Sequence, residues 1–467
     1  MGDSIRKMGR IEKIGWIITL ILTLACLVVP EQGIYTLTFK KFLAITIFCL
    51  SLAAFELVPN IMIAILFPAL YLATKCAPAQ VILSPWLGTT AIMLMGIFFM
   101  VATLNASGLL RRIAFKMMCL ANGSYLKILM MVFFVGVILN IATSGNSSII
   151  MAAICLGLCI SLNEVKGRIG AGLASAVMIG CCTSHAYTFQ ASVWGVINQM
   201  SAGYVDTVTP LPMMLHTWPL FIVSIVMVFV AYKMFGLNDE QKALFENVTY
   251  FKDELNKMGQ ITRREKVNLV MLLAVLLYMF TTSIHGMDLN LGFALIPWIV
   301  YFPFVNGADH DTLKSVQWDM PFFIMACMGI GTVAGSLGMS EAITTVCMNL
   351  LGDSTSVFSV LSIVFFIVFG LNFLMTPLAI IALITQPLIG IAASIGISPL
   401  PFLYAVNACS EAILLPYEYV PYLIVYGFGM ISMKDFIKFN FVRSIIFFGG
   451  FLLLLVPYWM LIGLFNV

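Results

Sequence analysis

Long apolar stretches follow one another along almost the whole chain, with only short polar segments between them. The first extends from Ile14 to Val29, and the last lies near 436–465. A helix needs roughly 20 apolar residues to cross a bilayer, so the chain could supply about eleven spans. Because 61% of its 467 residues are hydrophobic and 10% are charged, a water-soluble core could not bury this much apolar surface. The sequence predicts an all-α polytopic membrane protein.

Most of these stretches have the length of one membrane helix. The predicted spans lie near 14–30, 42–56, 58–75, 86–106, 169–200, 211–236, 267–284, 289–305, 318–337, 398–428 and 436–465. Two further apolar stretches, 126–160 and 355–395, are too long for one helix, and small polar residues break each of them in the middle. We interpret each as a re-entrant hairpin, which enters and leaves the membrane on the same side.

The placement of the basic residues predicts the orientation. With a cytoplasmic N-terminus and two re-entrant hairpins, only Lys40, Lys41 and Lys75 fall outside. The other 21 of the 24 Lys and Arg residues fall on the cytoplasmic side, as the positive-inside rule requires. We therefore expect an integral protein of the plasma (inner) membrane, with its N-terminus in the cytoplasm and its C-terminus outside.

The two halves of the chain resemble each other. Trp86 and Gly108 have counterparts in Trp318 and Gly338, at an offset of 230–232 residues. The predicted parts are a first repeat at 1–236 with its hairpin at 126–160, a cytoplasmic connector at 237–266, and a second repeat at 267–467 with its hairpin at 355–395. The hairpins are expected on opposite sides of the membrane, so the repeat is inverted. Inverted repeats with interrupted helices are typical of secondary transporters.

The first hairpin carries the sequence TSGNSS at 143–148, in the middle of an apolar run. Small residues let the chain turn, and the free N–H groups at the start of the next half-helix attract an anion. The alternative is that small residues only allow close helix packing. The matched breaks of the two halves favour a binding site. The predicted substrate-binding residues are Ser144, Gly145, Asn146, Ser147, Thr376, Pro377, Ser184 and Tyr419.

Several motifs are similar to those of the divalent anion/sodium symporter family, which carries di- and tricarboxylates and sulfate within the ion transporter superfamily. They are FELVPN with Glu56 and Pro59, NASGLLRRIA at 105–114, GNSSIIMAA at the first tip, and the segment 410–440. The resemblance implies a scaffold part, a mobile transport part, two hairpins and a homodimer. Where the family has Ser-Asn-Thr at the second tip, this chain has Met375, Thr376 and Pro377, which removes oxygens that a second sodium site would use.

Three ionisable residues fall within the interrupted helices, namely His185, Glu411 and Glu418. A carboxylate at bilayer depth costs about 2.5–3.5 kcal/mol, so such residues usually have a function. They could carry a proton, face a cationic group of the substrate, or pair with a hydroxyl as structural groups. The predicted coupling-ion residues are Asn146, Ser144, Thr376, Glu411, Glu418 and His185, with a possible Na⁺ near Ser144 and Asn146. We expect no Lys or Arg in the transport core.

These observations predict a secondary active transporter of small organic anions, di- or tricarboxylates, that is cation-coupled or works by exchange. The alternatives are a proton-coupled carrier of a zwitterionic substrate on the same fold and an ion channel. An enzyme is not expected, because HExxH, GxSxG and GxxxxGK[ST] motifs are missing from the sequence. The expected partners are the anion, the lipid bilayer and a second copy of the chain, without nucleic acid. Na⁺ or H⁺ is the expected coupling ion, with no other cofactor.

The predicted topology can be tested by cysteine labelling. In a background without the 11 native cysteines, single cysteines in place of Lys166 and Lys434 should react only from the cytoplasmic side. The reason is that both positions carry the basic residues that hold their loops inside. Labelling of both positions by a membrane-impermeant reagent added outside would contradict this orientation.

Overall fold

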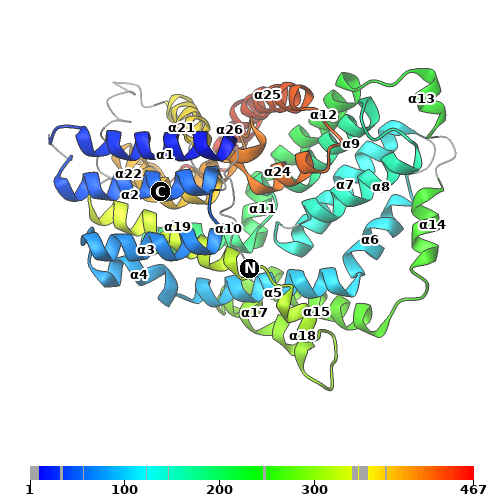
Figure 1. Cartoon of the computed structure of the whole chain (residues 1–467), viewed down its shortest axis with the longest axis horizontal. Helices are drawn as coiled ribbons and strands as arrows, with labels where there is room; N and C mark the ends of the chain where they lie inside the picture. The colour runs from blue at the N-terminus through cyan, green and yellow to red at the C-terminus, as the bar shows by residue number, and fades with distance from the viewer. Residues whose placement is uncertain are drawn as a thin grey trace, which may run out of the picture.

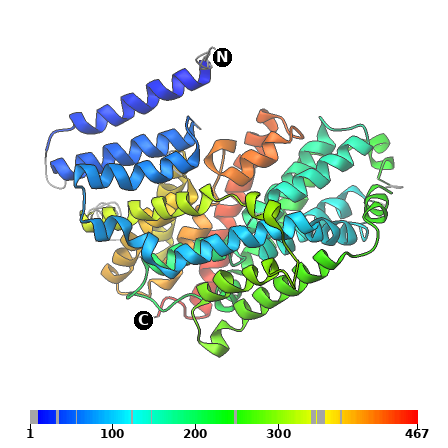
Figure 2. The same ribbon diagram turned by 60° about the horizontal axis from the view of Figure 1, so that its bottom comes forward.

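The computed structural model describes residues 10–31, 35–55, 57–121, 124–145, 147–245, 249–338, 345, 356–373 and 376–466. The described part is helical throughout and contains no strand, as the sequence predicts. Figure 1 shows the helices along a long axis, with α13 and α14 at one end and α21 and α22 toward the other. In Figure 2, α1 lies at the edge of the molecule, where it packs on α2.

The first half contains the helices up to α12. They are α1 (Arg10–Val28), α2 (Leu37–Ala54), α3 (Asn60–Thr74), α4 (Ala79–Leu87), α5 (Thr89–Ser107), α6 (Leu109–Met118), α7 (Tyr125–Thr143), α8 (Ser148–Ser161), α9 (Arg168–Val177), a π-helical turn (Met178–Cys182), a 3-10 turn (Thr183–Ala186), α10 (Ala191–Met200), α11 (Pro210–Thr217) and α12 (Pro219–Met234). The hairpin predicted at 126–160 is the pair α7 and α8.

The connector and the second half follow. They contain α13 (Asp239–Ala243), α14 (Tyr250–Lys257), α15 (Arg263–Phe280), α16 (Thr282–His285), α17 (Leu289–Leu295), a 3-10 segment (Ile296–Tyr301), α18 (His310–Lys314), α19 (Asp319–Ser336), α21 (Val357–Asn372), α22 (Pro377–Ser394), α23 (Leu400–Cys409), a 3-10 turn (Pro416–Glu418), α24 (Val420–Gly427), α25 (Met433–Gly450), a π-helical turn (Phe451–Leu455) and α26 (Val456–Leu461). The hairpin predicted at 355–395 is the pair α21 and α22.

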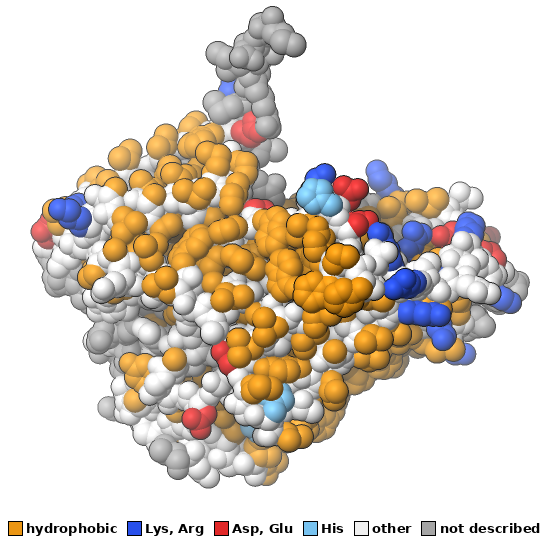
Figure 3. All heavy atoms as spheres, turned by 90° about the horizontal axis from the view of Figure 1, so that it is seen from below, with side chains coloured by type: hydrophobic (Ala, Val, Ile, Leu, Met, Phe, Trp, Pro, Cys, Tyr) orange, Lys and Arg blue, Asp and Glu red, His pale blue; other side chains and the backbone are white. Residues whose placement is uncertain are grey.

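Six helical segments of the described chain are long and apolar enough to cross a membrane, or seven if the bent pair α11 and α12 is one span. The count of eleven spans and the re-entrant character of the two predicted hairpins are therefore not confirmed. Five further apolar helices of the described chain have only 10–17 residues. Large apolar side chains such as Ile17 (56% exposed) and Leu24 (58% exposed) face outward on α1. Figure 3 shows hydrophobic side chains across the face seen from below, with Lys and Arg gathered toward one end.

The internal repeat has a local structural counterpart. Gly108 follows α5 with φ +79°, and Gly338 follows α19 with φ +73°. Glycine adopts this left-handed conformation without the steric penalty of a Cβ atom, so both helices end in the same way. The two hairpin pairs lie toward opposite ends of the molecule in Figure 1. The inverted relation of the two repeats stays a prediction.

The connector contains the two short helices α13 and α14. Arg112 of α6 contacts the C-terminal end of the connector. The Arg112 guanidinium donates to Glu265 Oε1 (2.6 Å) and to the carbonyls of Met258, Gly259 and Gln260. Nearby, hydrogen bonds from Thr312 and then Arg264 hold the pKa of the Asp309 carboxyl well below its ordinary value. These contacts fasten the connector to the ends of α6 and α15.

Candidate functional site

The first hairpin turns through two residues with left-handed backbone. Ser144 has φ +51° and Gly145 has φ +104°, and α8 starts again at Ser148. Gly145 N–H donates to the carbonyl of Asn140 (3.0 Å), while Ser144 Oγ accepts from the N–H of Ala191 across the break (2.9 Å). Asn146, which the sequence places at this tip, lies outside the described residues.

Asn140 connects the first tip to the break in the helix formed by α9 and α10. It is fully buried, and its Nδ2 donates to Ser184 Oγ (2.8 Å) and to Thr188 Oγ1 (3.4 Å). Its Oδ1 accepts from Ser147 Oγ at 3.4 Å. Ser147 and Ser184, both predicted to bind substrate, therefore lie in this buried network behind the tip.

The second half repeats this arrangement with different partners. Asn372 lies 232 residues after Asn140, at the end of α21, and is 1% exposed. Its Nδ2 donates to the carbonyls of Ser410 and Ala412, at 3.4 Å each, in the break between α23 and α24. In both halves an asparagine four residues before the tip donates hydrogen bonds to the interrupted helix of the same half. The sequence analysis missed both residues, although the repeat offset pairs them.

The two tips meet at one cavity of about 280 Å³, which we call the tip pocket. Its lining includes Ser144, Gly145, Thr376, Pro377 and Tyr419, five of the eight residues predicted to bind substrate. The starts of α8 and α22 both reach this lining, so two half-helix N-termini converge on the cavity. Free N–H groups and the helix dipole make such an end attractive to an anion.

Two hydrogen-bond donors of the tip pocket have no partner among the described residues. They are Gln190 Nε2, on the residue before α10, and Thr376 Oγ1, at the second tip. Gln190 is 3% exposed, and its amide lies against Gly145, where an added Cβ would come within 2.9 Å. A buried donor without a partner costs about 1–3 kcal/mol, so a ligand oxygen that accepts from it is stabilised. The sequence analysis missed Gln190.

The tip pocket contains no Lys, Arg or His among its described lining residues. Asp319, at the start of α19, is the one acidic residue that lines it. A fully ionised anion would therefore meet neutral donors and helix ends on one side and a carboxylate on the other. Asp319 also stabilises the N-terminus of its own helix, which is a structural role that needs no ligand.

A buried ionisable pair lies behind Tyr419. His185 Nδ1 is 3.1 Å from Glu411 Oε1 and 3.0 Å from the Tyr419 hydroxyl, and the side chains of His185 and Glu411 are both 3% exposed. His185 Nε2 and Glu411 Oε2 have no partner within the described chain. Tyr419 lines the tip pocket, so it joins the pocket to this pair. The structure thus brings together three of the predicted residues, His185, Glu411 and Tyr419.

Glu418 has different surroundings. Its Oε1 accepts from the N–H of Leu415 (2.9 Å) and its Oε2 from the N–H of Leu414 (3.1 Å). Both carboxylate oxygens are thus used to hold the backbone of the break. This geometry favours the structural alternative for Glu418.

The expectation that no Lys or Arg lies in the transport core is wrong. Arg443, in the middle of α25, is 1% exposed and belongs to the largest fully buried side chains. The sequence analysis counted it as a cytoplasmic charge, although it falls inside the predicted span 436–465. Its position within that apolar stretch was the signal, because a charge at such depth usually has partners.

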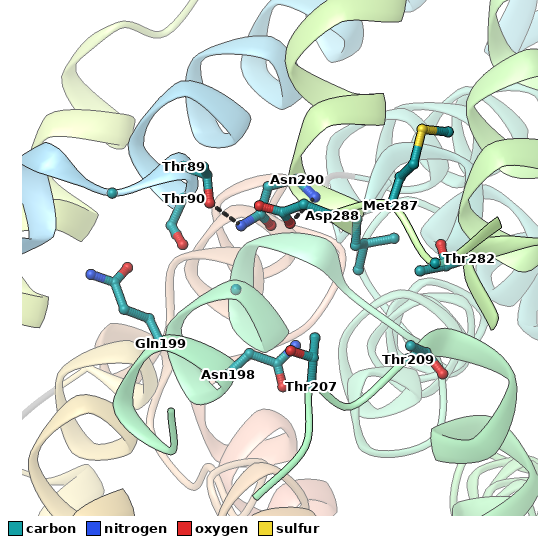
Figure 4. Close-up of a pocket in the computed structure, with 14 residues that line it drawn as sticks. Thr89, Thr90, Asn198, Gln199, Thr207, Thr209, Thr282, Met287, Asp288 and Asn290 are labelled. Atoms are coloured by element: carbon teal, nitrogen blue, oxygen red, sulfur yellow. Dashed lines mark hydrogen bonds between the residues drawn. The ribbon is translucent and has the colours of Figure 1, made fainter. Parts of the chain in front are cut away.

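Two further cavities lie beside the tip pocket. The larger, of about 610 Å³, is lined by threonines and amides from the start of α5, from α10 and from the loop before α17 (Figure 4). It touches neither tip, and its one ionisable residue among those described, Asp288, accepts from the N–H of Asn290 (2.9 Å). We therefore place the site at the tip pocket and not in this larger cavity.

The three cavities follow α5. Thr90 lines the larger cavity, Phe98 the tip pocket, and Asn105 a third cavity of about 490 Å³ that also contains Arg111. At 1.5 Å per helical residue these positions are roughly 12 Å and 10 Å apart along α5. Ile149 lines both the tip pocket and the third cavity. The cavities thus form a series from one end of α5 to the other.

Comparison with known families identifies the family of the chain. A family model described as citrate transporter (CitMHS) matches residues 50–407, which is more than half of the chain. No curated protein matches the chain significantly. The expected transport of carboxylates is confirmed at the level of the family, whereas the narrower resemblance to divalent anion/sodium symporters stays a prediction.

The paired asparagines give a test of the site. Asn140→Leu and Asn372→Leu should each lower transport by about tenfold or more, because each change leaves buried polar groups at a break without a partner. Uptake by purified protein in liposomes would measure this. Ser161→Ala is the matched control, since the Ser161 hydroxyl bonds only to a carbonyl of its own helix, that of Leu158. Uptake at the control level in both asparagine variants would contradict the assignment.

Proposed function

The chain belongs to the citrate transporter family, and we propose that it is a secondary active transporter of citrate or a related di- or tricarboxylate. Transport would proceed by alternating access, with the tip pocket open to one side of the membrane at a time. As an integral membrane protein it would work in the plasma (inner) membrane, with its N-terminus in the cytoplasm and a second copy as partner.

One observation carries this proposal: the N-termini of two half-helices and two donors without partners converge on one small cavity. A carboxylate accepts several hydrogen bonds, and in a desolvated pocket each bond to a charged acceptor is worth about 1.5–3 kcal/mol. One carboxylate would accept from the start of α8 and from Gln190. Another would accept from Thr376 and the start of α22.

Asp319 favours a second candidate function on the same fold. A carboxylate in the tip pocket repels a fully ionised tricarboxylate but attracts a substrate that brings a positive charge. A proton-coupled carrier of a zwitterionic carboxylate, such as an amino acid, would use the same helix ends and place its ammonium group near Asp319. A substrate panel with both classes separates the two candidates.

We propose H⁺ as the coupling ion at the pair His185 and Glu411, with Na⁺ near Ser144 and Asn146 as the alternative. The pair is shielded from water, has free ring and carboxylate atoms within the described chain, and reaches the tip pocket through Tyr419. Protonation would remove the negative charge of Glu411 and weaken its hold on His185. Tyr419 would then be free to turn toward the substrate, so that proton and substrate bind together.

The transport proposal predicts uptake by the purified protein in liposomes. Labelled citrate or another di- or tricarboxylate should accumulate under an imposed H⁺ or Na⁺ gradient. Gln190→Leu and Thr376→Val should each weaken apparent affinity by about tenfold or more, because each removes one hydrogen bond to a charged carboxylate, worth about 1.5–3 kcal/mol. Ser161→Ala serves again as control. Uptake of amino acids without any di- or tricarboxylate would select the second candidate, and uptake of neither class would refute both.

The coupling proposal predicts a pH effect that is specific to one glutamate. Glu411→Gln should flatten the pH dependence of net uptake between about pH 5.5 and 8 while counterflow exchange continues in part. Glu418→Gln is the matched comparison, because its amide can accept only one of the two backbone N–H bonds. It should lower stability and rate without changing the shape of the pH profile. A Glu411→Gln profile identical to that of the parent would show that the carboxylate is structural.

A further inference from the structure

The second break exposes a run of four backbone carbonyls, on Ser410, Glu411, Ala412 and Ile413. Asn372 donates to the first and third of them. Arg443 Nη2 donates to the second and fourth, Glu411 O (3.0 Å) and Ile413 O (2.9 Å). The carbonyls therefore alternate between two partners, an amide and a guanidinium.

The remaining groups of the Arg443 guanidinium also have partners. Nη1 donates to Thr183 Oγ1 (3.0 Å) in the break of the first half, and Nε donates to Asn440 Oδ1 (2.8 Å). The Tyr422 ring faces the guanidinium carbon at 5.0 Å from its centroid, a cation–π contact. Arg443 thus links the breaks of both repeats, and none of these partners lines the tip pocket.

Unwound carbonyls at a helix break are the groups with which secondary transporters hold a coupling cation. Here two of the four carbonyls already face a positive charge, and the other two face an amide. A free sodium ion would have to compete at the second break with the donors that already hold all four carbonyls. The first half contains no arginine in the matching position, and its break is kept short by π-helical and 3-10 turns.

We propose that Arg443 is a tethered cation that permanently fills the coupling-ion position of the second repeat. It holds the break in shape as a bound ion would. Because it stays attached to the chain, it returns with the empty carrier and adds no net charge to a transport cycle. This inference rests on the proposed transport function and specifies how many ions that transport requires.

The charge carried per cycle distinguishes this role from ordinary packing. Arg443→Met should lower uptake by about tenfold or more, since buried carbonyls lose their donors. Guanidinium or Na⁺ in the medium should restore uptake, and each rescued cycle should then carry one additional positive charge. At 100 mV that extra charge changes the attainable accumulation ratio by about fiftyfold, which reversal-potential measurements in liposomes resolve.

Two matched variants complete the design. Lys438→Met removes an exposed charge from the same helix and should leave both uptake and charge per cycle unchanged. Arg443→Lys keeps a cation at the break, so this variant should fold and transport without added cations. The charge carried per cycle should equal that of the parent. If Arg443→Met does not fold, the comparison of Arg443→Lys with the parent still decides, because a lysine variant that needs an added cation would contradict the proposal.

Further outcomes would overturn the inference. They are a folded Arg443→Met protein that no cation restores, rescue without extra charge, and two sodium ions per cycle in the parent. Thermal unfolding separates this result from the transport proposal, because millimolar guanidinium should raise the Tm of Arg443→Met but not that of the parent or of Lys438→Met. That measurement needs no substrate, so it stands even if the parent carries no carboxylate.

Discussion

Every backbone group that leaves a helix inside a bilayer must find a hydrogen-bond partner in the protein, because lipid offers none. This constraint accounts for a site that is built around asparagines and an arginine. Asn140 and Asn372 each donate hydrogen bonds to the break of their own repeat. Arg443 donates to the carbonyls of the second break that Asn372 does not reach. The breaks are needed because only an interrupted helix presents an N-terminus in the middle of a membrane. The buried polar network follows from that need.

The two repeats meet the same constraint differently. In the first repeat the break is short, and the side-chain hydroxyls of Ser184 and Thr188 accept hydrogen bonds from the amide of Asn140. In the second repeat the break is extended, and backbone carbonyls accept hydrogen bonds from both Asn372 and Arg443. The two asparagines therefore occupy matching positions, whereas only the second break has a positively charged donor. The pair His185 and Glu411 spans both breaks, which is why we propose it as the site that responds to protons.

The sequence predicted the helical class and five of the residues that line the tip pocket, because small polar residues inside a long apolar run interrupt the helix where lipid cannot satisfy the backbone. It did not predict the number of complete spans, since several helices are shorter than a bilayer and depend on neighbours that only the fold supplies. Gln190 and Arg443 were missed for a related reason. Their roles arise from contacts with distant segments, such as Gly145 and Ile413, and no local pattern encodes those contacts. For Glu418 the partners are local backbone groups, which favours the structural alternative and leaves the coupling role a prediction.

The separation of Arg443 from the tip pocket fits the work of a carrier. Two opposite charges 4 Å apart attract by about 4 kcal/mol at an effective dielectric constant near 20, so an arginine in the pocket would hold a polyanion tightly. A hydrogen bond from a neutral donor to a carboxylate contributes less, about 1.5–3 kcal/mol, so a few of them can orient a substrate without trapping it. A transporter must release its substrate on the far side of the membrane within each cycle. Neutral donors at Gln190 and Thr376, with the permanent charge kept behind the breaks, reconcile recognition with release.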